Sequence, residues 1–167
     1  MIQEVKRNYL EINSILDLNK VIEPSGDCSL NLLEPINFQL NKFFYKNIGK
    51  KHKWIDRLAW TENQWIDYVS NKNVETYVFK FKDDLAGFFE LISHDEKKEV
   101  EIAYFGLLEE FQNRKLGSYL LSQAIQKSFN RSIHRVWVHT CSLDHKNALN
   151  NYIARGMKIF KTETIKI

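Results

Sequence analysis

The sequence predicts a mixed α/β fold (an α+β mixed sheet) in which helices cover both faces of a sheet of roughly six to seven strands. Two observations lead to this prediction. Runs of β-branched and aromatic residues alternate with amphipathic stretches, in the order strand, two helices, three-strand meander, helix, strand, helix, strand. The length of 167 residues, with 44% hydrophobic and 13% aromatic residues, suffices for one sizeable core, so residues 1–167 are expected to form one domain.

The first half of the chain reads as two strands followed by two helices. Weak alternation predicts an edge strand over residues 5–12, and residues 29–34 form a candidate strand that Pro35 ends. Apolar residues at helical spacing predict a helix over 38–48 that Gly49 ends. The capping-box pattern Thr61-Glu-Asn-Gln64 marks the start of a second helix.

The second half begins with a meander and then alternates helix and strand. Acidic and polar turns separate the three meander strands, and one-sided apolar spacing indicates the helices. The expected elements are strands 74–81, 85–92 and 100–107, helix 116–129, strand 135–140, a helix around 148–153 and a strand over 157–167.

The stretch from Glu101 to Ser118 predicts an anion site. It reads as a strand, a short loop and the start of a helix, with small or polar residues where the loop becomes the helix. This layout presents backbone N–H groups and the positive end of a helix dipole to an anion. A phosphate-bearing cofactor is therefore expected at this turn.

Composition limits the remaining classes. The net charge of +3 is spread along the chain without a basic block, and the charges alternate in sign, which argues against a nucleic-acid-binding module. The two cysteines have no CxxC spacing, and the polar N-terminus does not resemble a signal peptide. No apolar run approaches the roughly 20 residues that span a bilayer. We expect a cytoplasmic protein that binds neither nucleic acid nor membrane.

Two motifs and the element order resemble the GNAT superfamily of acyl-CoA-dependent N-acyltransferases. The loop Gln112-Asn-Arg-Lys115-Leu-Gly117 follows the family's Gln/Arg-x-x-Gly-x-Gly/Ala pattern, and Ala148, Tyr152 and Gly156-Met157 follow its later helix. The stretch 136–145 looks like a bacterial subgroup without assigned substrates. The resemblance implies a splay between the strands at 100–107 and 135–140. It also implies transfer of an acetyl group from acetyl-CoA to a primary amine, by direct attack in a ternary complex and without a metal.

The resemblance also assigns the cofactor contacts. The backbone of the splayed strand is expected to pair with the pantetheine amides, the Leu107 N–H to stabilise the oxyanion, and the loop to hold the pyrophosphate. The expected cofactor-binding residues are Phe105, Gly106, Leu107, Gln112, Asn113, Arg114, Lys115, Leu116, Gly117, Ser118 and His145.

Two of these residues depart from the family pattern. Lys115 stands where the motif has its first glycine; a helical backbone there makes the change harmless, whereas a positive φ strains a lysine. His145 stands where an asparagine often precedes the later helix, and its imidazole is expected to replace that contact. These departures keep open a second class, a non-catalytic acyl-CoA-binding or sensor domain.

Tyr152 matches the general acid of the family. Helical spacing alone indicates only a tyrosine packed in the core, so this role rests on the resemblance. Glu101, flanked by Val100 and Ile102, is expected to be partly desolvated, which suits a general base. Glu90 is the competing carboxylate for that role.

The aromatic-rich segment around Trp54, Arg57 and Trp60 lies where the family builds its acceptor pocket. Its rings can hold an amine by cation–π contact and Arg57 can hold an acid. Trp54, Arg57 and Glu90 are therefore candidate substrate-binding residues for a small-molecule amine. A protein N-terminus or lysine stays open as the acceptor, and the oligomeric state, a homodimer included, is undetermined.

His139, Cys141, Asp144 and His145 form a further polar cluster. Their spacing matches no standard zinc pattern, and a family whose nucleophile is the substrate amine needs no protein nucleophile. We expect a polar network that holds the strand-to-helix turn, with Asp144 capping the following helix.

Overall fold

Seven strands form one mixed sheet in the order β2-β3-β4-β5-β6-β1-β7 in the computed structural model, which describes residues 1–167. The strands are β1 Glu4–Ile12, β2 Cys28–Leu32, β3 Val74–Phe81, β4 Asp84–His94, β5 Glu99–Leu107, β6 Arg135–Cys141 and β7 Lys158–Lys166. The helices are α1 Phe38–Gly49, α2 Glu62–Ser70, α3 Leu116–Ser128 and α4 Ala148–Ala154.

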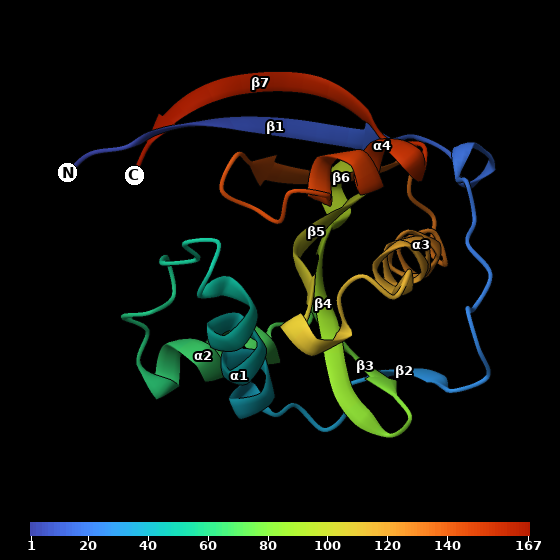
Figure 1. Ribbon diagram of the computed structural model, residues 1–167, viewed down its shortest axis with the longest axis horizontal. Coiled ribbons are helices and arrows are strands. Elements are labelled where there is room, and N and C mark those ends of the chain that lie inside the picture. Colours follow the sequence, from blue (N-terminus) through green and yellow to red (C-terminus); the bar gives the residue numbers. More distant parts are fainter.

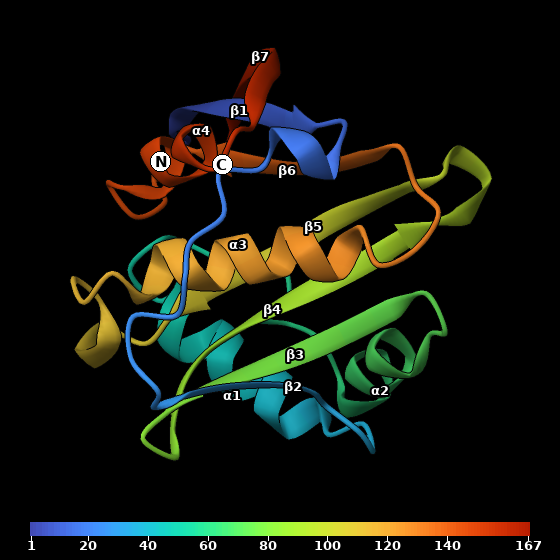
Figure 2. The same ribbon diagram turned by 90° about the vertical axis from the view of Figure 1, so that its right-hand side faces the viewer.

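The helices lie on both faces of the sheet. α1 and α2 cover one face of β3, β4 and β5, and α3 crosses the opposite face (Figure 1, Figure 2). α4 packs beside β6 and β1, near α3 (Figure 1). This arrangement confirms the predicted fold class. No helix of the protein combines the length and apolar character needed to cross a membrane.

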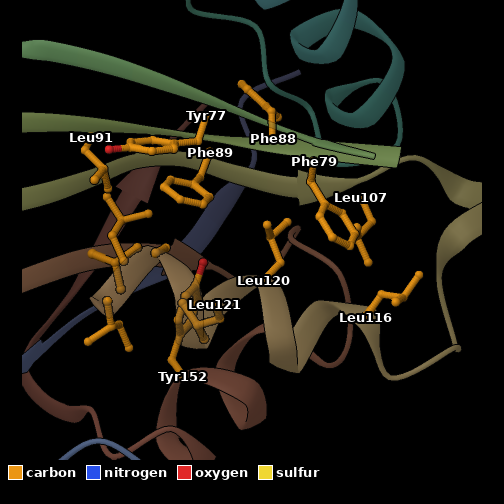
Figure 3. Close-up of a cluster of buried hydrophobic side chains, with 14 of the residues drawn as sticks. Tyr77, Phe79, Phe88, Phe89, Leu91, Leu107, Leu116, Leu120, Leu121 and Tyr152 are labelled. Carbon is orange, nitrogen blue, oxygen red and sulfur yellow. The ribbon is translucent and has the colours of Figure 1, made fainter. Parts of the chain in front are cut away.

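The core fills the space between α3 and the meander. Leu120 and Leu121 of α3 face the aromatic side chains of β3 and β4, where the rings of Tyr77 and Phe89 stack at 4.9 Å (Figure 3). Phe88 points to the other face of the sheet and stacks on Phe44 of α1 at 5.0 Å. Strand alternation therefore supplies apolar side chains to both helical layers.

Local signals place the helix boundaries within a residue or two of their predicted positions. Thr61 caps α2 through its side chain while the Gln64 side chain returns to the Thr61 N–H, which completes the predicted capping box. α1 lies so close to β5 that a Cβ added at Gly106 would stand 2.7 Å from Ile48 Cγ2. Only glycine permits this approach.

The prediction that residues 5–12 form an edge strand is wrong. β1 lies inside the sheet, antiparallel to both β6 and β7. Leu10 is fully buried opposite Val138 and Ile159, so the strand contributes to the core. The alternation looks weak in the sequence because the other face of β1 carries residues that line a cavity rather than bulk solvent.

β5 and β6 run parallel but pair only at their beginnings. The paired residues are Glu99 with Arg135, Val100 with Val136 and Glu101 with Trp137. Beyond Glu101 the two strands diverge, as the resemblance to the GNAT superfamily implied. The divergence opens the middle of the sheet and places the candidate site there.

Candidate functional site

A cavity of about 730 Å³ occupies the gap between the diverging strands β5 and β6. Its walls come from β5, the start of α3, the β6–α4 loop, the α1–α2 loop and one end of β1 and β7. The cavity therefore joins segments from the whole length of the chain. Most of the predicted site residues line it; Arg114, Leu116 and Glu90 do not.

The backbone of β5 faces the cavity with free polar groups. The Leu108 N–H donates to the Ala86 carbonyl at 2.8 Å, which makes the facing residues Gly87 and Leu107 a non-hydrogen-bonded pair. The N–H and C=O groups of Leu107, and by alternation those of Phe105, therefore point away from β4. They point into the gap, where β6 no longer pairs with β5.

The loop before α3 forms a second polar wall. Asn113 and Lys115 both have left-handed backbones, with φ of 63° and 62°. Left-handed residues within a short turn bring successive N–H groups together in a concavity that suits an anion. Two loop residues point elsewhere: the Arg114 guanidinium lies over the Phe111 ring, and Leu116 is buried in the core.

Of the two backbone conformations considered for Lys115, helical or positive φ, the structure has the positive φ. Lys115 is the residue before α3, in the left-handed conformation, and its side chain makes no cap hydrogen bond. A non-glycine residue in this conformation costs about 1–2 kcal/mol. The missing motif glycine therefore leaves strain in the loop while the loop keeps its shape.

Two amide side chains hold this wall in place. Gln112 Nε2 donates to the Leu107 carbonyl at 3.2 Å, which joins the loop to the end of β5. Asn151 Nδ2 donates to the Gly117 carbonyl at 3.2 Å, which joins α4 to the first turn of α3. The sequence analysis did not single out Asn151, because its role depends on the packing of two helices.

Tyr152 extends from α4 to the edge of the cavity. Its side chain is buried beside Leu121, with its ring 6.4 Å from that of Phe105 (Figure 3). Burial, and secondarily Asp144, raises the pKa of Tyr152 well above its ordinary value. The phenol therefore stays protonated and can donate a proton into the cavity.

Glu101 lies on β5 at the far end of the cavity from the α3 loop. Its Oε1 is 3.0 Å from His94 Nε2, and the side chain of Glu101 is 19% exposed while that of His94 is 37% exposed. The His94 ring stacks on Trp137. A carboxylate inside the cavity thus contacts an imidazole that reaches solvent.

Arg57 and Glu90 form a buried ion pair. Arg57 Nη1 lies 3.0 Å from Glu90 Oε1, while the Tyr68 hydroxyl and Asn41 Nδ2 donate to the same carboxylate at 2.6 and 2.9 Å. Five rings surround the guanidinium at centroid distances of 4.1–5.6 Å: Tyr45, Trp60, Trp65, Tyr68 and Tyr104. The chain itself therefore supplies the cation that fills this aromatic cage.

The α1–α2 loop closes one side of the cavity. Trp54 Nε1 donates to Asp144 Oδ1 at 3.4 Å, and His52 Nδ1 lies 3.0 Å from the Leu143 carbonyl, so the loop contacts the β6–α4 loop. The Trp54 ring also packs edge-on against Tyr104 at 4.8 Å. The cavity is therefore covered by a loop that is tied at several points.

Asp144 does not cap α4, contrary to expectation. Its Oδ2 accepts hydrogen bonds from the Thr140 hydroxyl and the Cys141 N–H, while Asn147 is the residue before α4. The polar network at the end of β6 therefore consists of Asp144 with Thr140, the Cys141 N–H and Trp54, whereas His145 accepts from the Asn147 N–H and His139 packs against the Tyr9 ring. No group of three or more His, Cys, Asp or Glu side chains is arranged to hold a metal ion.

β1 and β7 supply cavity residues that the sequence analysis missed. Val5, Arg7, Ile165 and Ile167 line the cavity together with His139 of β6. Burial, followed by Arg7, lowers the pKa of His139. The signal in the sequence was the alternation of Val5, Arg7 and Tyr9, which marks one face of a strand but not what that face covers.

Comparison with known proteins gives one family and many related folds. A model of the acetyltransferase (GNAT) family matches residues 37–157. No curated protein matches the chain at a significant level. An acetyltransferase from Bacillus subtilis, solved in complex with CoA, has a TM-score of 0.59 and 22% identity, over 80% of this chain and 78% of its own.

Two further structures have the same fold at lower identity. A GCN5-related N-acetyltransferase from Kribbella flavida has a TM-score of 0.67 and 14% identity, and the match covers 99% of this chain and 58% of that one. An aminoglycoside acetyltransferase from an uncultured soil metagenomic sample has a TM-score of 0.65 and 13% identity, over 80% and 90% of the two chains.

The chain is shorter than several of these proteins. It spans 58% of the Kribbella flavida protein, 61% of a conserved protein of unknown function from Staphylococcus epidermidis and 51% of a GCN5-related N-acetyltransferase from Sphaerobacter thermophilus. At these identities the likeness concerns the fold alone.

Proposed function

Because the chain belongs to the acetyltransferase (GNAT) family, we propose that it transfers an acetyl group from acetyl-CoA to the primary amine of a small molecule. The amine attacks directly in a ternary complex, so no side chain carries the acetyl group. The observation that carries the proposal is the outward-facing backbone of Phe105 and Leu107, which leads from the anion-binding loop to Tyr152 within one cavity.

The residues around the cavity fit acetyl-CoA. Pantetheine amides can pair with the outward-facing N–H and C=O groups of β5, as an added strand would, apart from the Leu107 carbonyl that accepts from Gln112. Gly117 gives a further argument: a Cβ at this position would meet no protein atom closer than 3.7 Å, and its φ is not in the left-handed region. Protein packing therefore does not require this glycine, whereas a closely approaching pyrophosphate does.

Each role can be given to one group. Acetyl-CoA supplies an activated acetyl group as a thioester. The N–H of Leu107 points to where the carbonyl oxygen would gain charge, and Tyr152 holds a proton for the departing thiolate. Glu101 accepts the proton of the amine, and its contact with His94 at 3.0 Å offers that proton a path to solvent. The burial of Glu90 against Arg57 favours Glu101 over Glu90 as the base.

The loop beside the cavity supports a small acceptor. The α1–α2 loop forms one wall of this partly open cavity and is held by Trp54, His52 and Arg57, so the acceptor side is a recess rather than a flat groove. The strained Lys115 is the feature that keeps the acyl-CoA sensor as the alternative.

One sequence of measurements tests the proposal. Acetyl-CoA binding is measured by calorimetry, and thiol release is then followed with a panel of amines. Binding with amine-dependent thiol release, lost in Tyr152→Phe, supports the acetyltransferase. Absence of binding would contradict both the enzyme and the sensor. Binding without release, unchanged in Tyr152→Phe, would point to the sensor.

A further inference from the structure

Arg7 brings a positive charge to the wall of the cavity that β1 forms, across the gap from β5. It projects from the face of β1 that also carries Val5, between Cys141 of β6 and Glu163 of β7. The wall around it contains Val5, Ile165, Ile167, His139 and Cys141, and the charged side chains of Lys53 and Asp144 line the same cavity. A guanidinium in such a wall is expensive to desolvate unless it has a partner.

Arg7 has few hydrogen-bond or ionic partners in the protein. Its Nε is buried and has no hydrogen-bond partner, and its one ionic contact is a distance of 3.9 Å from Nη1 to Glu163 Oε1. That carboxylate is already shared, because Oε1 accepts from the Tyr9 hydroxyl at 2.6 Å and Oε2 lies 3.5 Å from Lys161. Most of the five donors of the guanidinium therefore remain unused.

Negatively charged side chains line the same cavity as Arg7. Glu101 and Asp56 line the cavity as well, and Asp56 comes from the α1–α2 loop that covers it. His139 is close to both signs of charge: burial and then Arg7 lower its pKa, while Glu101, Asp144 and Asp56 act in the opposite direction. The cavity thus carries the carboxylates of Glu101 on β5 and Asp56 on the α1–α2 loop, and the guanidinium of Arg7 on β1.

We propose that the acceptor is an amino-carboxylate, a small molecule that carries its amine and a carboxylate together, and that Arg7 binds the carboxylate. The amine then lies toward Glu101, the base of the proposed reaction. This inference rests on the proposed function and names the class of acceptor for the same site.

The chemistry of arginine supports this class. A guanidinium presents two parallel N–H groups that match a carboxylate, and a buried Nε without a partner is one of the donors that such a fork uses. A purely cationic acceptor, such as a polyamine or an aminoglycoside, would place a positive charge against Arg7 in a partly desolvated wall. Arg7 therefore selects for the carboxylate and against polycations.

The test compares each amino acid with its own carboxamide. A panel of L-amino acids, β-alanine and γ-aminobutyrate is measured as carboxylates and as primary amides, by thiol release with saturating acetyl-CoA and by calorimetry on the CoA-loaded protein. A charge-assisted hydrogen bond predicts that the best carboxylate exceeds its amide by about 10- to 100-fold in kcat/KM. Spermidine and kanamycin represent the polycations.

Variants of Arg7 localise the effect. Arg7→Gln should reduce the carboxylate-to-amide ratio of kcat/KM to about one, and Arg7→Lys should keep part of the preference. Lys6→Gln is the matched control, since Lys6 is an exposed cation on the other face of the same strand. The comparison of carboxylate and amide in the unmodified protein stands even when a variant folds poorly.

The outcomes separate the two proposals. Thiol release from amides or polycations as fast as from carboxylates, or a preference that persists in Arg7→Gln, overturns the amino-carboxylate inference and leaves the acetyltransferase intact. Absence of acetyl-CoA binding, or of thiol release with every amine tested, overturns both.

Discussion

Arg57 and Glu90 are paired at 3.0 Å where almost no water reaches, with side-chain exposures of 6% and 0%. The pair joins the α1–α2 loop to the middle of β4. Tyr68 adds a hydrogen bond from α2, and burial followed by the neighbouring Glu90 carboxylate raises the pKa of its phenol far above the ordinary value. The carboxylate of Glu90 is therefore a buried attachment point for the segment that covers the cavity, in addition to the contacts of Trp54 and His52.

Replacing Arg57 with methionine should lower the free energy of unfolding by about 3–5 kcal/mol, because Glu90 would remain buried without its counter-ion. Urea denaturation measures this change. The double variant Arg57→Met/Glu90→Gln should recover part of the loss, since it removes the unpaired charge. A single variant as stable as the unmodified protein would show that the pair does not hold the loop.

Tyr152→Phe should lower kcat on the order of 100-fold or more, as expected for loss of a general acid. The affinity for acetyl-CoA should change little, because the ring keeps its packing beside Leu121. Stopped-flow thiol release and calorimetry measure the two quantities. Tyr119→Phe is the matched control, on α3 and outside the cavity lining. Equal loss in both variants would indicate a general effect on folding rather than proton transfer.

Glu101→Gln should lower kcat/KM by about 100-fold near neutral pH and remove the acid-side fall of the pH–rate profile that protonation of the base produces. His94→Gln should have a smaller effect on the rate, since the base remains and only its path to solvent changes. Glu96→Gln serves as an exposed control on the neighbouring turn. An unchanged profile in Glu101→Gln would exclude Glu101 as the base.

Two substitutions of Lys115 separate strain from charge. Lys115→Gly should raise the free energy of unfolding by about 1 kcal/mol, because glycine adopts a φ of 62° without strain. Lys115→Met keeps the strain and removes the ammonium. If the ammonium contacts the pyrophosphate, Lys115→Met should weaken acetyl-CoA binding more at low salt than at high salt. A stability loss in Lys115→Gly would contradict the strain argument.

Two histidines should make the fold less stable in acid. Burial lowers the pKa of His139 and His145 below the ordinary value of 6.5, so the unfolded chain binds protons more readily than the folded one. The unfolding free energy should therefore fall as the pH drops below about 6.5. Denaturation at about pH 7 and pH 5 should show a smaller fall in His139→Gln/His145→Gln. Parallel pH curves for the variant and the unmodified protein would contradict this account.

The elements were predictable where the signals are local. The capping box at Thr61 and Gln64 acts within one turn of helix, so the sequence alone marks it. Gly49 is the last residue of α1 but keeps a helical backbone, and it permits the close approach of Trp54 rather than acting as a left-handed cap. The place of β1 was not predictable in this way. Its neighbours β6 and β7 lie more than a hundred residues away, and alternation does not say which strands a strand will join.

The site was predictable in part, where its residues belong to a local sequence motif. Gln112, Gly117 and Tyr152 follow a pattern of residues, and they line one cavity with Glu101. The pairing of Arg57 with Glu90 depends on two segments that meet only in the fold, so the aromatic segment resembled a free cation site. The left-handed backbone of Lys115 could not be predicted from the sequence, because lysine is not one of the residue types that commonly adopt this conformation.

The position of β1 also has a consequence for how the protein is made. β1 is the first of the seven strands to leave the ribosome, and β7, which pairs along its length, is the last. The hydrogen bond from Tyr9 to Glu163 spans 154 positions. Until β7 emerges, β1 has one unprotected edge and Arg7 has no cavity to face. The cavity wall that carries Arg7 can be completed only after β7 has been made, which predicts that the site matures later than the meander and that β1 needs shielding until then.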